Sequence, residues 1–300
     1  MFCYIHFVRI ICNPAAAGGR LGREWSRVER RLRELGLEAD VVFTEAPWHA
    51  VELAERAVHE GVETVVAAGG DGTACEVAMG LHRARGGRLA MLPLGTGNDV
   101  ARTLGVPLKF EEAARVALDG RCRAVDLIRV GEYAVPNAIG VGLLGDISER
   151  AARIKWIRGF IVYLATALVS IIKFPTPHVR LVTERGTAYD GEMTIVSVHN
   201  GPTSGGGFRL TPRAVPDDGL LDVTLVPGVG PLGRLPRLLA AMRGTLASKP
   251  GTLELQAPWL ELHFEDPLPV HIDGNVTTLE PPLARFEIVP KAIDVLVPKD

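Results

Sequence analysis

The sequence predicts an α/β domain with a parallel β-sheet, followed by a second domain that is a β-sandwich. Residues 1–123 alternate apolar, strand-like runs with stretches of helical spacing, which is typical of a parallel sheet covered by helices. Beyond residue 123, short β-branched runs recur between turns such as Asp218-Gly219 and Asp273-Gly274, which is typical of an antiparallel sandwich. We therefore expect a first domain of residues 1–123, completed by residues 291–300, and a second domain of residues 124–290.

The composition indicates a globular protein and excludes some classes of partner. The chain has 300 residues, of which 47% are hydrophobic and 23% are charged, enough for a large core in two domains. A net charge of −2 creates no overall field for nucleic acid, so we expect no nucleic-acid partner. The longest uncharged apolar run, residues 160–172, is shorter than the roughly 20 residues of a spanning helix. Because the four cysteines form no CxxC pair, we expect a cytoplasmic protein with reduced thiols and no transmembrane segment.

Each element of the first domain has a local signal. The clearest helix follows a turn at residues 13–20 and places one apolar face every three or four residues. The residues on that face are Leu21, Trp25, Val28, Leu32 and Leu35. The next helix is expected from Pro47 to Gly61, and two more are expected to open at Thr73 and to end at Leu104. The predicted strands are residues 7–12, 38–44, 65–68 and 88–92.

The second domain is predicted from short apolar runs and two helical stretches. The helices are expected at about residues 146–173 and 231–243. Two final runs, residues 284–289 and 292–297, could close either domain. The other predicted strands are residues 124–130, 179–182, 193–198, 221–226, 253–255, 260–264 and 270–273.

The turn that follows the third strand is the strongest candidate for a functional site. It reads Gly69-Gly70-Asp71-Gly72-Thr73. Glycines allow a positive φ and a close approach by a ligand, and a helix opening at Thr73 would point free N–H groups at an anion. Asp71 would project into that site, where a magnesium ion could offset its charge. The plainer alternative is an ordinary turn in which Asp71 only caps the helix.

A second turn makes a phosphate site the better interpretation. It follows the fourth strand and reads Gly95-Thr96-Gly97-Asn98-Asp99. Ligands bind beyond the carboxyl ends of parallel strands, and the turns at residues 13–20, 69–73 and 95–99 all follow strands. The chain has no GxxxxGK[ST] sequence, which excludes a P-loop. A GxGxxG sequence at residues 140–145 lacks an acidic residue about twenty positions later, so we interpret its glycines as close packing beside Asn137.

These motifs resemble those of the diacylglycerol kinase and sphingosine kinase catalytic-domain superfamily, and most closely its bacterial soluble lipid kinases. The resemblance covers most of the chain and begins with the two glycine turns. It extends to Asn13-Pro14, Gly18-Gly19, Thr44, His49-Ala50, Gly205-Gly206-Gly207, residues 212–223, Asp273-Gly274, Pro290-Lys291-Ala292 and Val297-Pro298.

The resemblance implies a Rossmann-like nucleotide-binding domain of the NAD kinase and diacylglycerol kinase type, a β-sandwich domain, and an ATP and lipid site in the cleft between them. It implies that Mg-ATP is held by Asn13, Thr44, Gly69, Gly70, Asp71, Gly72, Thr73, Gly95, Thr96, Gly97 and Asn98. A structural magnesium ion would be held by Asp218 and the carbonyl groups of Val215 and Leu220, with support from Asp126. The implied reaction moves the γ-phosphoryl group of ATP to the hydroxyl of diacylglycerol or a related lipid at the membrane surface.

One position departs from the family. The family usually reads Asp-Gly-Glu where this chain has Asp273-Gly274-Asn275, and that glutamate is a candidate for the base that takes the hydroxyl proton. A general base typically contributes on the order of 10²–10⁴-fold, so its loss could leave a slow enzyme. Alternatively, Asp71 or Asp273 serves as the base. A third possibility is a regulator that binds lipid and nucleotide with little or no turnover.

Further alternatives concern the reaction and the partners. NAD kinases share the glycine-aspartate turn but have a following Asn-Glu pair, and no asparagine of this chain precedes a glutamate. The basic and apolar stretch of residues 150–173 is either a buried helix or a surface that rests on the inner face of the membrane. An exposed strand edge in either domain could also pair two chains in a homodimer.

Overall fold

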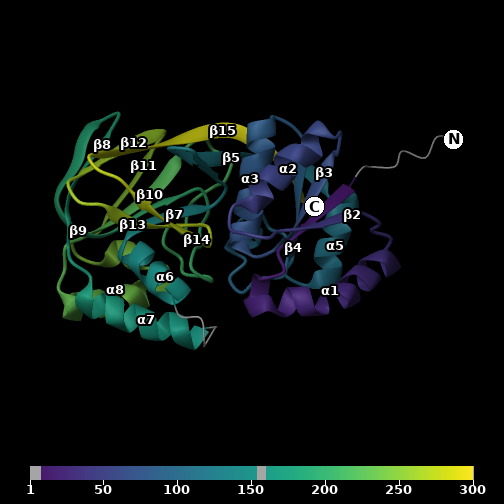
Figure 1. Ribbon diagram of the computed structural model, residues 1–300. Coiled ribbons are helices and arrows are strands. Elements are labelled where there is room, and N and C mark those ends of the chain that lie inside the picture. Colours follow the sequence, from purple (N-terminus) through teal and green to yellow (C-terminus); the bar gives the residue numbers. More distant parts are fainter. Residues whose placement is uncertain (1–7, 154–159, 300) are drawn as a thin grey trace. The chain divides into compact units, whose positions relative to one another are not determined.

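The computed structural model describes residues 8–153 and 160–299, which divide into two compact units (Figure 1). The first unit contains Met1–Asp126 and Lys291–Asp300, and the second contains Leu127–Pro290. The chain passes from one unit to the other within two strands, β5 (Arg121–Val130) and β15 (Leu283–Val297).

The first unit is built on a parallel sheet, as predicted. Its strands are β1 (Val8–Cys12), β2 (Asp40–Phe43), β3 (Thr64–Gly69) and β4 (Arg88–Pro93), in the spatial order β2-β1-β3-β4. Neighbouring strands pair in parallel, and the C-terminal part of β15 adds a further parallel strand beside β4. All six residues of β3 are buried, which explains why this strand is a continuous apolar run.

The helices of the first unit begin at slightly different residues from those predicted. They are α1 (Ala16–Glu34), α2 (His49–His59), α3 (Asp71–Ala84), α4 (Asp99–Thr103) and α5 (Phe110–Asp119). The prediction that a helix opens at Thr73 is wrong, because extended Gly70 is the N-cap and α3 already begins at Asp71. The predicted start at Pro47 is also wrong, because Trp48 is left-handed, with φ 66°, and precedes the first helical residue.

The second unit contains the predicted sandwich of antiparallel strands. One sheet has the order β14-β13-β7-β9-β10-β11, and the first half of β9 also pairs with β8, which pairs with β12. The strands are β6 (Tyr133–Val135), β7 (Ala138–Gly142), β8 (His178–Thr183), β9 (Gly186–His199), β10 (Leu221–Pro227), β11 (Leu253–Ala257), β12 (Trp259–Phe264), β13 (Leu268–Ile272) and β14 (Asn275–Leu279). The two predicted runs at residues 284–297 form one strand, β15.

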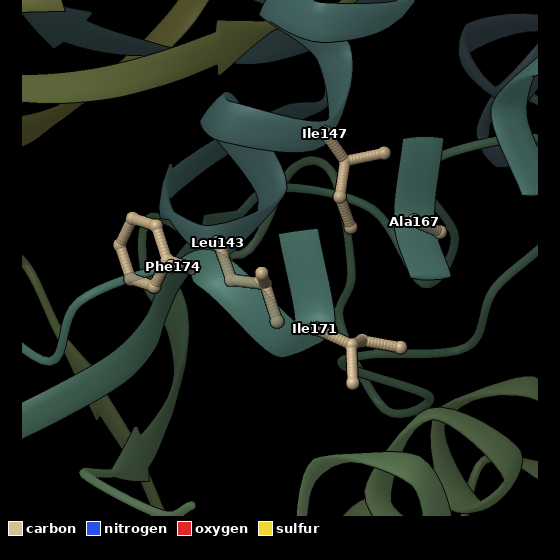
Figure 2. Close-up of a cluster of buried hydrophobic side chains, with 5 residues drawn as sticks. All are labelled: Leu143, Ile147, Ala167, Ile171 and Phe174. Carbon is tan, nitrogen blue, oxygen red and sulfur yellow. The ribbon is translucent and has the colours of Figure 1, made fainter. Parts of the chain in front are cut away.

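The helices of the second unit lie close together (Figure 1). They are α6 (Leu143–Arg153), α7 (Phe160–Lys173) and α8 (Pro231–Arg243), and a short 3-10 helix, η1, spans Leu246–Ser248. The single helix predicted at residues 146–173 is therefore two helices, and residues 154–159 lie outside the described part. Figure 2 shows the apolar side chains that pack α6 against α7 and the residue after it: Leu143 and Ile147 with Ala167, Ile171 and Phe174. None of the described helices combines the length and apolarity needed to cross a bilayer.

The GxGxxG sequence serves close packing, as predicted. It covers the end of β7 and the first turn of α6. A Cβ atom on Gly145 would lie 2.1 Å from the carbonyl oxygen of Pro269, and one on Gly140 would lie 2.8 Å from Leu144 Cδ1. The missing side chains therefore allow α6 to lie against β13 and β7.

We predict that Gly145→Ala lowers the free energy of unfolding by roughly 2–3 kcal/mol, because the new methyl group collides with backbone that has nowhere to move. The matched control is Gly233→Ala in α8, where the added methyl group meets no atom closer than 3.3 Å. Alanine there should change the free energy of unfolding by less than about 1 kcal/mol, because its helix propensity offsets a small shift of the Val229 side chain. Urea unfolding of both variants measures the difference, and equal effects would contradict the packing explanation.

Candidate functional site

Three turns meet at the carboxyl ends of β1, β3 and β4. The side chain of Asn13, after β1, donates a hydrogen bond from Nδ2 to Thr73 Oγ1 at 3.1 Å. The amide of Leu94, after β4, donates to the carbonyl of Gly69 at 2.8 Å. A Cβ atom on Gly95 would lie only 2.4 Å from the Cα of Gly70, so the two glycine turns touch backbone to backbone. This mutual contact requires a glycine at position 95.

Asp71 links the two glycine turns electrostatically. It lies at the start of α3, and its Oδ1 accepts a hydrogen bond from the Val100 amide at 2.9 Å. The amides of Asn98 and Asp99 also bond its carboxylate, so one acidic side chain occupies the N-terminus of α4. Asp71 therefore caps a helix that follows the other turn, in addition to beginning its own.

The environment of Asp71 changes its acidity. Burial raises the pKa of Asp71 to about 6, and the negative charge of Asp99 adds to the increase, while the amide hydrogen bonds oppose it. A carboxylate that is costly to ionise in the free protein gains from a nearby cation. This environment fits a group that would hold a magnesium ion.

Asn98 closes the second turn. Its left-handed backbone, with φ 57°, allows the side chain to reach back to Gly95. Oδ1 accepts from the Gly95 amide at 3.1 Å, and Nδ2 donates to the Gly95 carbonyl at 3.3 Å. The hydroxyl-bearing Thr96 between them is exposed. Thr44 lies at the same end of the sheet, where its amide donates to the Cys12 carbonyl at 3.0 Å.

The predicted catalytic position Asp273 has a clear structural task. With Gly274 it forms a two-residue hairpin between β13 and β14, in which φ is 35° and 91°. The carboxylate is 2% exposed and accepts bonds from the amides of Asn137 and Ala138, each at 2.9 Å, and from Asn137 Nδ2 at 3.2 Å. Since donors occupy both oxygens, these contacts favour a structural role over that of a base. Asn275 begins β14 directly after this turn.

Asp126 also has a structural contact. It is fully buried, and its Oδ1 accepts a hydrogen bond from the Lys291 amide at 2.7 Å. This bond connects β5 with β15 inside the first unit. Its support of a magnesium site stays a prediction.

A polar cavity of about 520 Å³ in the second unit contains the predicted structural-metal residue Asp218. Asp218 Oδ1 accepts from the Leu220 amide at 3.0 Å, and Val215 lines the same cavity. Asp222 was not predicted as a site residue, although it lies in the family-like segment of residues 212–223 and is an acidic residue within the apolar run of β10. It is 8% exposed and has a buried oxygen, Oδ2, without a hydrogen-bond partner among the described residues.

The Asp222 environment suits an oxygen-bound cation. Burial raises the pKa of Asp222 to about 6, and the charges of Asp218 and Glu254 raise it further. Magnesium prefers such oxygen ligands. Among the residues that the structure describes, no three His, Cys, Asp or Glu side chains surround one point as a metal site would require. A set of one or two carboxylates with backbone carbonyls and water does not need three such side chains.

A second cavity of the same unit is apolar. It has a volume of about 120 Å³ and lies between α6, α7, α8 and the strands β9 and β10. Its lining is mainly aliphatic, and its polar side chains are those of Thr194, Ser204, Arg234, Arg237 and His271. Burial lowers the pKa of His271 to about 4, so this imidazole is neutral near pH 7. Such a cavity suits an apolar group with a polar end.

Comparison with known proteins assigns both parts of the chain to families. Residues 7–130 match the diacylglycerol kinase catalytic domain. Residues 137–297 match the YegS C-terminal NAD kinase β-sandwich-like domain. The first match contains the glycine turns, and the second contains the polar and apolar cavities.

Whole-chain relatives agree with this assignment. A Pseudomonas aeruginosa protein named "Probable lipid kinase YegS-like" is 35% identical, and the match covers 89% of this chain and 87% of the relative. A Xanthomonas euvesicatoria protein with the same name is 34% identical, with 89% of each chain covered.

Solved structures share the fold. A diacylglycerol kinase from Bacillus anthracis superposes with a TM-score of 0.72 at 23% identity, covering 99% of this chain and 98% of the other. An NAD kinase from Archaeoglobus fulgidus in complex with ATP superposes with a TM-score of 0.57 at 15% identity, covering 97% and 93%. The chain therefore belongs to the family of YegS-like lipid kinases, with a diacylglycerol kinase catalytic domain followed by the YegS-type β-sandwich domain.

Proposed function

We propose that this protein is a magnesium-dependent lipid kinase that transfers the γ-phosphoryl group of ATP to the hydroxyl of diacylglycerol or a related lipid at a membrane surface. The observation that carries the proposal is the contact between the three turns at the carboxyl ends of β1, β3 and β4. Helix N-termini and turn amides at this edge of a parallel sheet suit phosphate groups. The fold neighbour described with ATP supports this choice of nucleotide.

The proposed division of labour follows the contacts. Asn13, Thr73 and the turn amides at residues 69–72 and 95–98 would orient the phosphates, and Asp71 would hold a cation beside them. Asp218, with the carbonyls of Val215 and Leu220, would hold a structural cation in the second unit. Magnesium, when bound, neutralises charge on the phosphate oxygens. In the transfer, the lipid oxygen forms a bond to the γ-phosphorus, the bond to the ADP oxygen breaks, and the hydroxyl proton leaves to a base or to water.

The apolar cavity is the proposed site for an acyl chain of the lipid. Its aliphatic lining excludes water, while Ser204 and the neutral His271 offer hydrogen bonds to an ester or hydroxyl group. A kinase whose acceptor is wholly polar, such as an NAD kinase, would not need an apolar cavity to bind that acceptor. We therefore favour a lipid acceptor.

The direct test gives the purified protein Mg²⁺, labelled ATP and a panel of lipids in detergent micelles. We expect labelled phospholipid product with diacylglycerol or a close relative, and none with Asp71→Ala, which removes the anchor of the second turn. Full activity of Asp71→Ala would overturn the site assignment. A protein that bound no nucleotide and labelled no lipid would overturn the function.

The pH dependence of Mg-ATP binding tests the role of Asp71 separately. Because burial raises the pKa of Asp71 to about 6, the carboxylate is protonated below that pH and cannot attract Mg²⁺. The affinity for Mg-ATP should fall as the pH drops through 6, and below pH 6 the loss should approach tenfold for each pH unit. Isothermal titration calorimetry from pH 5 to 8 measures this. Asp71→Asn should bind weakly and lose the additional dependence.

The design separates Asp71 from other titrating groups. The γ-phosphate of ATP also titrates near pH 6, but it does so equally with the wild type and with Asp71→Asn. The difference between their two pH profiles therefore isolates Asp71. Asp222→Asn measures any contribution of the second unit, because burial raises the pKa of Asp222 to about 6 as well and its environment also suits a cation. Identical pH profiles for the wild type and Asp71→Asn would show that Asp71 holds no cation.

Asn275 distinguishes a slow kinase from a regulator that only binds. We expect Asn275→Glu to raise kcat by roughly 10²-fold or more, because it places a carboxylate directly after the hairpin turn. Asn275→Gln is the control, because it lengthens the side chain without adding a base. An unchanged kcat in an active enzyme would mean that another group accepts the proton. No turnover in either variant, with nucleotide still bound, would favour the regulator.

A further inference from the structure

Helix α8 exposes most of its leucines and directs two of its arginines inward. Its cavity side bears Arg234 and Arg237 together with Leu238 and Ala241. Its outer stripe, at spacings of three and four residues, bears large apolar side chains that face solvent. These are Leu232, Leu235, Leu239 and Met242, with exposed fractions of 93%, 47%, 46% and 50%. A helix on a water-facing surface normally has the opposite arrangement.

Within the described part of the chain, backbone carbonyls rather than acidic side chains hold the cations on the inner side. Arg234 is 5% exposed and donates to the carbonyls of Val229 and Ile171, each at 2.8 Å. Arg237 donates to the carbonyls of Gly233 and Pro250. The bond to Ile171 joins α8 to α7, and the two helices lie side by side (Figure 1).

Helix α7 continues the exposed apolar surface. Leu168, Val169 and Ile172 are 48%, 41% and 66% exposed. Of the twelve exposed large hydrophobic residues in the described part of the chain, seven therefore belong to α7 and α8, which have only 14 and 13 residues. Scattered apolar residues are normal on a protein surface, but a concentration of this kind marks an interaction site.

The charged side chains that these two helices carry have one sign. The sequence contains no Asp or Glu between residues 160 and 183 or between residues 223 and 253. Lys173 and Arg243, at the C-terminal ends of α7 and α8, are both exposed. The chain as a whole has a net charge of −2, so this basic region is a local departure.

We propose that the outer stripes of α7 and α8, which we term the docking face, insert into the surface of an anionic phospholipid bilayer. The docking face comprises Leu168, Val169, Ile172, Leu232, Leu235, Leu239 and Met242. Exposed apolar side chains on helices that carry cations and no acidic residue of their own match the acyl boundary and anionic headgroups of a bilayer. A second copy of this chain fits less well, because a symmetric contact would bring two basic regions together.

The location of the apolar cavity adds a reason for docking, and this reason rests on the proposed lipid kinase function. The apolar cavity lies directly behind α7 and α8, and Met242 belongs both to its lining and to the docking face. A lipid could therefore leave the bilayer and place its acyl chain in the cavity without crossing water.

Vesicle sedimentation tests the proposal. Wild-type protein should bind vesicles of phosphatidylcholine mixed with an equal amount of phosphatidylglycerol, and should bind less in high salt, which screens the headgroup attraction. Leu235→Ser/Leu239→Ser should lower the partition coefficient at least about tenfold, since it removes two inserting side chains. The matched control is Leu108→Ser/Leu118→Ser, whose leucines are 40% and 44% exposed in the first unit. It should bind like the wild type.

Several outcomes would overturn the docking face. Wild-type protein that stays in the supernatant, or equal binding by both double variants, would do so. So would a wild-type dimer that the α8 variant dissociates, because a second copy would then be the occupant. Thermal melts of the exposed-site variants should match the wild type.

A kinase assay separates this proposal from the proposed function. With a short-chain diacylglycerol below its aggregation concentration, the docking variant should keep wild-type turnover, while turnover of vesicle-borne lipid falls with binding. Vesicle binding that depends on α8, in a protein that phosphorylates no lipid, would reject the proposed function and leave the docking face standing. Loss of both activities in the docking variant would reject docking as its role.

Discussion

The structure of the candidate nucleotide site depends on one carboxylate, that of Asp71. It joins the start of α3 to the amide N-terminus of α4, so the turns after β3 and β4 are held in one arrangement. Helix N-termini attract anions, and here an internal anion already occupies one of them. Asp71 is therefore both a cap and a partly desolvated charge; burial raises its pKa, and the capping amides offset only part of that rise. The same side chain would attract a cation when phosphates arrive.

The second unit uses acidic residues in two different ways. Asp273 is saturated by the donors of Asn137 and Ala138 and fixes a tight hairpin. Asp222 is also buried, but one of its oxygens has no hydrogen-bond partner among the described residues, and it shares a polar cavity with Asp218. A carboxylate that accepts hydrogen bonds at both oxygens stabilises a turn, whereas one with an oxygen that accepts none suits a bound cation. This contrast, rather than the motif, separates the two roles.

Local sequence signals predicted the turns but not their contacts. The glycines, Asp71 and the strand ends were all visible, because turn chemistry and apolar periodicity are local. The start of α3 at Asp71 was not visible in the sequence, because it depends on the extended backbone of Gly70. Asp222 was missed because its burial results from strand pairing with β9 and β11. In α8, Leu238 faces the cavity beside Arg234 and Arg237 while the other leucines are exposed, and only long-range packing decides which side turns inward.

A crystal structure of the protein with Mg²⁺ and a non-hydrolysable ATP analogue tests the central claim most directly. The account predicts that the phosphates contact the amides of residues 69–73 and 95–98, with the bond between Asp71 and Val100 intact or exchanged for a bound cation. Phosphates bound away from these turns, or turns that separate when nucleotide binds, would contradict it.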